Sequence, residues 1–325
     1  MRRFLVILLV LVIMAAGVAE WGVAKFSAPG PSTKVTDVVI KPGVHLHGIA
    51  DALVAAGVIE RPQIFEWGVR LHQTGSKLKA GEYAIPAHAS MSDIMTLLMS
   101  GKTVEHKITA AEGLTSDMIW KLVKADPSLT GDAGPLPLEG TLLPETYLFD
   151  RGATRASIIA RMTKAQADLI AKLWPARQAD LPWTTPEQAI VAASLVEKET
   201  GVPAERAHVA AVFVNRLRLG IKLQSDPTII YTLTGGYPLG RGIRESELNR
   251  VTPYNTYAVA GLPPGPICNP GRDSIAAVLN PGTTEDMYFV AAGNGGHVFS
   301  KTVEEQNRHV AELRARERAA KAGHP

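Results

Sequence analysis

The chain has 325 residues, of which 46% are hydrophobic and 20% are charged, a composition typical of globular proteins. At this length we expect two folded units, since a domain usually contains about 100–200 residues. Lys and Arg number 34 against 31 Asp and Glu, and a net charge of +3 argues against a nucleic-acid-binding surface. The single cysteine, Cys268, excludes an intramolecular disulfide and a Cys-rich zinc site.

The N-terminus predicts a membrane anchor. Arg2 and Arg3 precede a mostly apolar segment, residues 4–24, which is long enough to cross about 30 Å of hydrocarbon. The arginines favour a cytoplasmic N-terminus, and Trp21 is a residue typical of the membrane interface. The rest of the chain would then lie outside the cytoplasmic (inner) membrane. A cleaved signal peptide is the alternative, because residues 17–19 (Gly-Val-Ala) fit a cleavage site.

Residues 35–110 predict a small α+β unit, which follows a short linker rich in Pro and Gly. Alternation and helical spacing of apolar residues indicate short elements in this unit. Strands are expected at 35–40, 78–85 and 104–108, and helices at 47–56, 64–72 and 92–99.

Residues 111–325 predict a larger, mostly helical unit, so that the fold class is α+β. Helices are expected at 116–123, 154–174, 186–200, 204–219 and 302–322. A β-hairpin is expected at 288–299 around a glycine-rich turn. The stretch 222–280 is rich in Gly, Pro, Asn and Tyr, and such a long irregular segment inside a compact domain is usually functional.

Two carboxylates end the apolar helix predicted at 186–200. Glu197 and Glu199 are two residues apart, which on a helix separates them by about 200° of rotation. They therefore cannot share one cleft as a close acid pair. Glu199 has apolar neighbours on its side of the helix, which would raise its pKa toward the range that a general acid needs. The alternative is that both are helix-end charges, one of them paired with Lys198 or Arg206.

Further polar side chains are candidate site residues; among them, the amide and phenol groups at 254–257 suit sugar hydroxyls and amides. These candidates are Asn215, Gln224, Asp226, Tyr254, Asn255, Tyr257, Glu145 and His297. Each also has a structural alternative. Asp226 before a proline suits a helix N-cap, the Tyr and Asn residues suit plain loop packing, and His297 suits the cap of a hairpin.

The sequence predicts no metal and no cofactor. None of the nine histidines forms a His-x-x-x-His pair on a predicted helix. The Gly101-Lys102-Thr103 segment lacks the first glycine of a phosphate-binding loop and follows a helix instead of a strand.

Taken together, the motifs resemble those of the MltG-type (YceG-like) endolytic murein transglycosylases over nearly the whole chain after the anchor. The matching segments are AAEGLT at 110–115, LEGTLLPETY at 138–147, ASLVEKET at 193–200, VFVNRL at 212–217, LQSDPT at 223–228, YNTY at 254–257, GLPPGPI at 261–267, YFV at 288–290 and GGHVF at 295–299. One departure is Leu142-Leu143-Pro144-Glu145, where the family favours an aromatic residue, proline and aspartate.

The resemblance implies a single-pass anchor at 1–25, a LysM-like subdomain at 35–110 and a YceG-like catalytic domain at 111–325. It also implies that Glu199 is catalytic and that the substrate is the glycan strand of peptidoglycan, cut between N-acetylmuramic acid and N-acetylglucosamine. Glycan polymerases and penicillin-binding proteins are the implied partners.

One carboxylic acid is enough for a lytic transglycosylase, which closes the muramic acid 6-hydroxyl onto C1, whereas a glycoside hydrolase normally needs two. Two alternatives stay open at this point. The first is a muramidase with Asp226 or Glu145 as the second carboxylate, and the second is a non-catalytic, membrane-anchored wall-binding protein.

Overall fold

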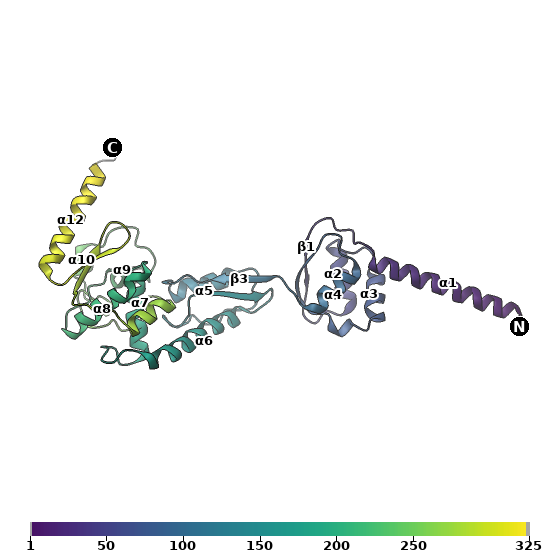
Figure 1. Ribbon diagram of the computed structural model, residues 1–325, viewed down its shortest axis with the longest axis horizontal. Helices are drawn as coiled ribbons and strands as arrows, with labels where there is room; N and C mark the ends of the chain where they lie inside the picture. The colour runs from purple at the N-terminus through teal and green to yellow at the C-terminus, as the bar shows by residue number, and fades with distance from the viewer. Residues whose placement is uncertain (1, 323–325) are drawn as a thin grey trace. The chain divides into compact units, whose positions relative to one another are not determined.

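The computed structural model describes residues 2–322, whose helices and strands are labelled in chain order in Figure 1. The chain divides into two units. The first comprises Met1–Lys107 and Leu148–Ala153, and the second comprises Ile108–Tyr147 and Thr154–Pro325. Residues 148–153 belong to the first unit, although the sequence predicts the whole of 111–325 as the second unit. The predicted α+β class is confirmed.

The apolar N-terminal segment forms one continuous helix, α1 (Arg2–Ser27), as predicted. It is long and apolar enough to cross a membrane. Most of its apolar side chains are exposed; for example, Val18 is 68% exposed. Its last turns pack against the rest of the first unit, where Gly22 is buried and Phe26 is 4% exposed.

The first unit is built on two antiparallel strands, β1 (Thr36–Ile40) and β2 (Gly81–Ile85), in a register that pairs Thr36 with Ile85. Between them in sequence lie α2 (Leu46–Ala55), α3 (Pro62–Leu71) and the 3₁₀ turn η1 (Gly75–Lys77), and α4 (Met91–Ser100) follows β2. A capping box of Ser90 and Asp93 starts α4, and Gly101 in the left-handed conformation ends it. Leu53, Phe65, Tyr83, Ile94 and Leu98 are fully buried in the core.

A second pair of strands joins β3 (Glu105–Thr109) to β4 (Thr146–Asp150). β3 is predicted from the sequence, whereas β4 is not. The second unit then contains α5 (Ser116–Ala125), α6 (Arg155–Leu173) and the 3₁₀ turn η2 (Trp174–Ala176). Threonine side chains cap both helices, with Thr115 at the start of α5 and Thr154 at the start of α6.

The core of the second unit is α7 (Pro186–Glu199) packed against α8 (Arg206–Arg218) and α11 (Arg272–Leu279). Thr185 caps α7, and Pro186 occupies its first turn, where a missing backbone N–H costs nothing. From Ala189 to Val196 every residue of α7 is buried. A helix that is apolar on all sides requires such burial, and it makes α7 a rigid support for the residues at its end.

The stretch predicted as a long functional loop, 222–280, contains three helices: α9 (Asp226–Thr234), α10 (Glu245–Leu248) and α11. The 3₁₀ turn η3 (Pro203–Glu205) connects α7 to α8. The predicted hairpin is present as β5 (Tyr288–Ala291) and β6 (His297–Ser300), with Tyr288 opposite Ser300. The terminal helix α12 (Val303–Ala322) follows the hairpin and contacts both of its strands.

Candidate active site

A cavity of about 590 Å³ opens in the second unit beside the end of α7. It is bounded by α7, α8, the segment that leads into α9, the β5–β6 hairpin and α12. Apolar side chains such as Leu223 and Phe289 form part of the wall. The polar residues predicted from sequence that line the cavity are Glu199, Gln224, Asp226, Tyr257 and His297.

Glu199 is the last residue of α7, and it is only partly accessible. Burial raises its pKa from 4.5 to about 7; the charge of Asp226 adds to this rise, and the Ser225 hydroxyl opposes it. The negative end of the α7 dipole also disfavours an ionised carboxylate at this position. Near neutral pH a large share of the Glu199 side chains therefore keeps its proton inside the pocket, which is the property that general acid catalysis requires.

Glu197 faces away from this cavity, as the helical rotation predicts. Its side chain is 6% exposed, and its carboxylate accepts a 2.9 Å hydrogen bond from the backbone N–H of Gly271 and lies 3.7 Å from Arg206. Arg206 also contacts Glu112 and Asp273. Glu197 is thus the helix-end glutamate that pairs with Arg206, whereas Glu199 is not.

Arg216 is a cavity residue that is not among the site residues predicted from sequence. Its side chain is buried, lines the cavity and donates from Nη2 to Oε1 of Gln224 at 2.5 Å. The guanidinium lies 5.2 Å from the centre of the Tyr288 ring, and its Nε finds no hydrogen-bond partner among the described residues. Burial lowers the pKa of Arg216 from its usual value. This donor-only group is placed to receive acceptor oxygens of a ligand.

Asp226 and Tyr257 form a second polar pair in the cavity wall. The Tyr257 hydroxyl donates to Oδ1 of Asp226 at 2.5 Å. Burial, this hydrogen bond and the neighbouring carboxylates raise the pKa of Tyr257, so the phenol stays protonated. Asp226 is the first residue of α9, and the residue at the N-cap is Ser225, so the expected N-cap role of Asp226 is not found.

His297 lies at the start of β6 and is held there by Glu205, which is not among the site residues predicted from sequence. Glu205 in η3 accepts from the His297 backbone N–H at 2.9 Å and lies 2.8 Å from His297 Nδ1. Thr200, the residue after Glu199, donates its hydroxyl to the same carboxylate at 3.1 Å. Burial acts to raise the pKa of Glu205, but these hydrogen bonds outweigh it and the pKa is lowered. The ionised Glu205 therefore ties the hairpin to the end of α7.

Four predicted site residues do not line this cavity. The Asn215 amide donates to the carbonyls of Thr284 and Asp286, and the Asn255 amide donates to three carbonyls, including that of Arg250. Tyr254 packs against Tyr231, with 5.1 Å between ring centres. These three residues organise the chain around the site.

Glu145, the fourth of these residues, is exposed and lies 3.6 Å from Arg272. It is thus paired at the surface of the second unit. Within residues 2–322, no group of three or more His, Cys, Asp or Glu side chains is arranged to hold a metal ion.

Comparison with known proteins gives consistent matches. The profile of the YceG-like family matches residues 38–312. The chain is 30% identical to the endolytic murein transglycosylase of Bacillus subtilis (strain 168), with 85% of this chain and 84% of that protein aligned. It is 30% identical to the endolytic murein transglycosylase of Streptococcus pneumoniae (strain D39), spanning 86% of this chain and 59% of that longer protein. The crystal structure of a YceG-like protein from Listeria monocytogenes superposes with a TM-score of 0.52 and 31% identity, covering 85% of this chain and 99% of that one.

Proposed function

The chain belongs to the YceG-like family, and from this membership we propose that it is a membrane-anchored endolytic lytic transglycosylase of peptidoglycan. It would cut the bond between N-acetylmuramic acid and N-acetylglucosamine inside glycan strands, and so terminate or trim nascent strands. The observation that carries the proposal is a single carboxylic acid, Glu199, whose pKa is raised to about 7 inside a polar cavity.

The proposed reaction uses Glu199 twice. Its protonated carboxyl gives a proton to the glycosidic oxygen as the bond from that oxygen to C1 of the muramic acid breaks. The 6-hydroxyl oxygen of the same sugar then closes onto C1, and its proton passes to the Glu199 carboxylate. The acid is thereby restored, no water is consumed, and the product ends in a 1,6-anhydro sugar.

The other polar groups of the cavity are proposed to hold the glycan. Arg216 and Gln224 present hydrogen-bond donors for carbonyl and hydroxyl oxygens, and the Asp226–Tyr257 pair presents acceptors for hydroxyls. Tyr288 and Phe289 offer apolar surface for the sugar faces. Glycan polymerases and penicillin-binding proteins remain the proposed partners.

A muramidase is the second candidate function, because one other carboxylate, Asp226, lines the same cavity. Mass spectrometry of purified glycan strands after digestion distinguishes the two reactions. We expect new ends that are 1,6-anhydro sugars and carry no solvent oxygen when the digestion is run in H₂¹⁸O. Reducing ends that contain ¹⁸O would identify a hydrolase instead.

The pH dependence of cleavage follows from the pKa of Glu199. The acid must carry its proton to start the reaction, so the rate should be highest below pH 7 and fall about tenfold per pH unit well above it. We expect a descending limb in the pH profile of kcat/KM with a midpoint near 7. A rate that stays constant from pH 6 to pH 9 would exclude Glu199 as the proton donor.

The membrane anchor is proposed on α1, which has the length of a span and two N-terminal arginines, Arg2 and Arg3. We expect the protein extracted from membranes to keep its N-terminal 24 residues, as measured by intact mass and N-terminal sequencing. A mature chain that begins at Glu20 would instead identify the segment as a signal peptide.

The first unit is proposed to be the LysM-like, glycan-binding part. The order β1–α2–α3–β2 with antiparallel β1 and β2 supports this proposal. Contacts with sugars far from the cleaved bond would help to orient the strand at Glu199.

A further inference from the structure

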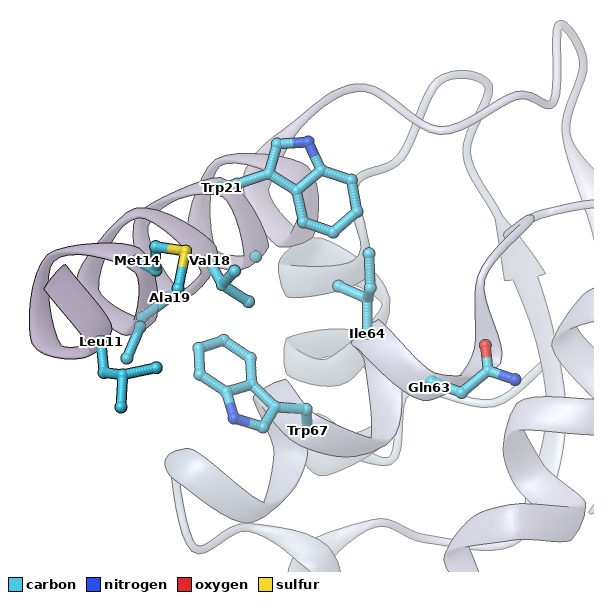
Figure 2. A pocket seen from close by; sticks show the side chains of 10 residues that line it. Leu11, Met14, Val18, Ala19, Trp21, Gln63, Ile64 and Trp67 are labelled. Atoms are coloured by element: carbon cyan, nitrogen blue, oxygen red, sulfur yellow. The ribbon is translucent and has the colours of Figure 1, made fainter. Parts of the chain in front are cut away.

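An apolar groove runs between α1 and α3 in the first unit, outside the candidate active site. Its volume is about 720 Å³. Figure 2 shows Leu11, Met14 and Val18 of α1 on one side and Ile64 and Trp67 of α3 on the other. The lining is almost wholly apolar, with the Gln63 amide at one end. A soluble protein rarely leaves a continuous surface of this kind open to water.

The packing of α1 on α3 is fixed by two contacts between a glycine and an aromatic ring. A Cβ atom on Gly22 would lie 3.4 Å from the Trp67 ring, and one on Gly68 would collide with the Phe26 ring. Phe26 is itself 4% exposed and stacks on His72 with 6.0 Å between ring centres. Because both glycines allow close approach, α1 is seated on α3 over its last turns, and the walls of the groove are held together.

If α1 crosses the membrane, these contacts determine at which level of the bilayer the groove lies. Trp67 touches α1 at Gly22, inside the apolar segment 4–24. From Gly22 the groove continues along α1 to Leu11, which at 1.5 Å per residue is about 16 Å, or half of a 30 Å hydrocarbon core. The groove would therefore open into the outer half of the bilayer.

The exposed face of α3 fits an interfacial helix. Phe65 and Val69 are buried in the core, whereas Trp67 is 38% and Leu71 57% exposed on the opposite side. The guanidinium of Arg61 lies 5.3 Å from the Trp21 ring centre, a pairing of Arg and Trp that suits the headgroup level. Gln63 and Arg70 are also exposed on this helix, so that its outward face combines apolar side chains with polar and basic ones, as in a segment that lies in the membrane surface.

We propose that this groove binds the acyl chain of a phospholipid of the outer leaflet, an inference that rests on the membrane anchor of the proposed function. The first unit is thereby seated on the membrane through α3 as well as through α1. The continuity of the groove with the exposed apolar surface of α1 selects a lipid chain over a soluble ligand.

The test places the photocrosslinking residue benzoylphenylalanine at position 67 of the full chain in liposomes of phosphatidylethanolamine and phosphatidylglycerol. Val39 is the matched control, because it is an exposed apolar residue of the same unit, at 43%, and does not line the groove. Mass spectrometry after irradiation should detect a phospholipid adduct at position 67 and near-background adduct at position 39. A second, conservative variant, Trp67→Phe, should reduce the fluorescence quenching caused by brominated acyl chains.

The outcomes separate the groove from the enzyme. Equal adduct at both positions, or a protein dimer crosslinked at position 67, overturns the lipid assignment, and the dimer would identify a second copy as the occupant. Glycan cleavage is measured in the same liposomes. Cleavage without the lipid adduct would support the proposed activity and overturn the groove proposal. A lipid adduct without cleavage would support the groove proposal and overturn the proposed activity. A mature chain without α1 overturns the groove together with the anchor.

Discussion

Replacing Glu199 with Gln is expected to lower glycan cleavage by about 10²- to 10⁴-fold, the usual contribution of a general acid–base group. The amide keeps the shape of the side chain but cannot give a proton to the glycosidic oxygen. The matched control is Glu197→Gln, two residues earlier on the same helix. We expect it to cost about 1–3 kcal/mol of stability, because a buried carboxylate that accepts from Gly271 and faces Arg206 is lost, yet to leave the rate per folded molecule nearly intact.

Thermal unfolding of the same two variants checks that they fold and tests the pKa. The folded-state pKa of Glu199 is raised from 4.5 to about 7, so the folded protein holds this proton more tightly than the unfolded chain. Stability then falls as pH rises from about 4.5 to about 7. Glu199→Gln removes this penalty, and its melting temperature should exceed that of the parent at pH 8 but not at pH 4. An inactive Glu197→Gln beside an active Glu199→Gln would reverse the assignment of the acid.

Replacing Arg216 with Gln is expected to lower kcat/KM by about 10- to 100-fold, the range for losing a hydrogen bond from a charged donor. Its guanidinium is buried at the cavity with an unpartnered Nε, and its link to Gln224 would be weakened as well. Arg216→Lys should restore only part of the activity, because an ammonium lacks the planar arrangement of donors.

The control for Arg216 is Arg218→Gln on the same helix. Arg218 is exposed and donates to the carbonyl of Asp180, outside the cavity. Steady-state kinetics on purified strands should show a loss for Arg216→Gln alone. Equal losses in both variants would mean that the effect is one of net charge and not of the site.

The arrangement of Glu197 and Glu199 could be predicted from sequence because helical rotation is a local property. Two residues of a regular helix are separated by a fixed rotation about its axis, and the apolar segment before Glu197 identifies the helix. The apolar helix at the N-terminus and the hairpin at 288–299 are predictable for the same reason, since each depends only on nearby residues.

The parts that could not be predicted depend on distant partners. Thr146–Asp150 becomes a strand through β3, which lies far away in the sequence. Glu205 gains its role from His297, 92 residues later. Asn215 and Asn255 have the right chemistry for a sugar site, but their amides are used by backbone carbonyls. A sequence shows which groups can hydrogen-bond, and only the folded chain shows which partners they find.

Gln224 occupies the left-handed backbone region with φ of +53°, which side chains other than glycine seldom adopt. Holding this conformation costs about 1 kcal/mol or more relative to glycine. This conformation places the Gln224 side chain in the cavity wall, where its amide oxygen accepts a hydrogen bond from Arg216. Selection for thermal stability alone should therefore favour glycine at position 224, and this change would weaken glycan binding. Selection for cell-wall function should keep the strained glutamine.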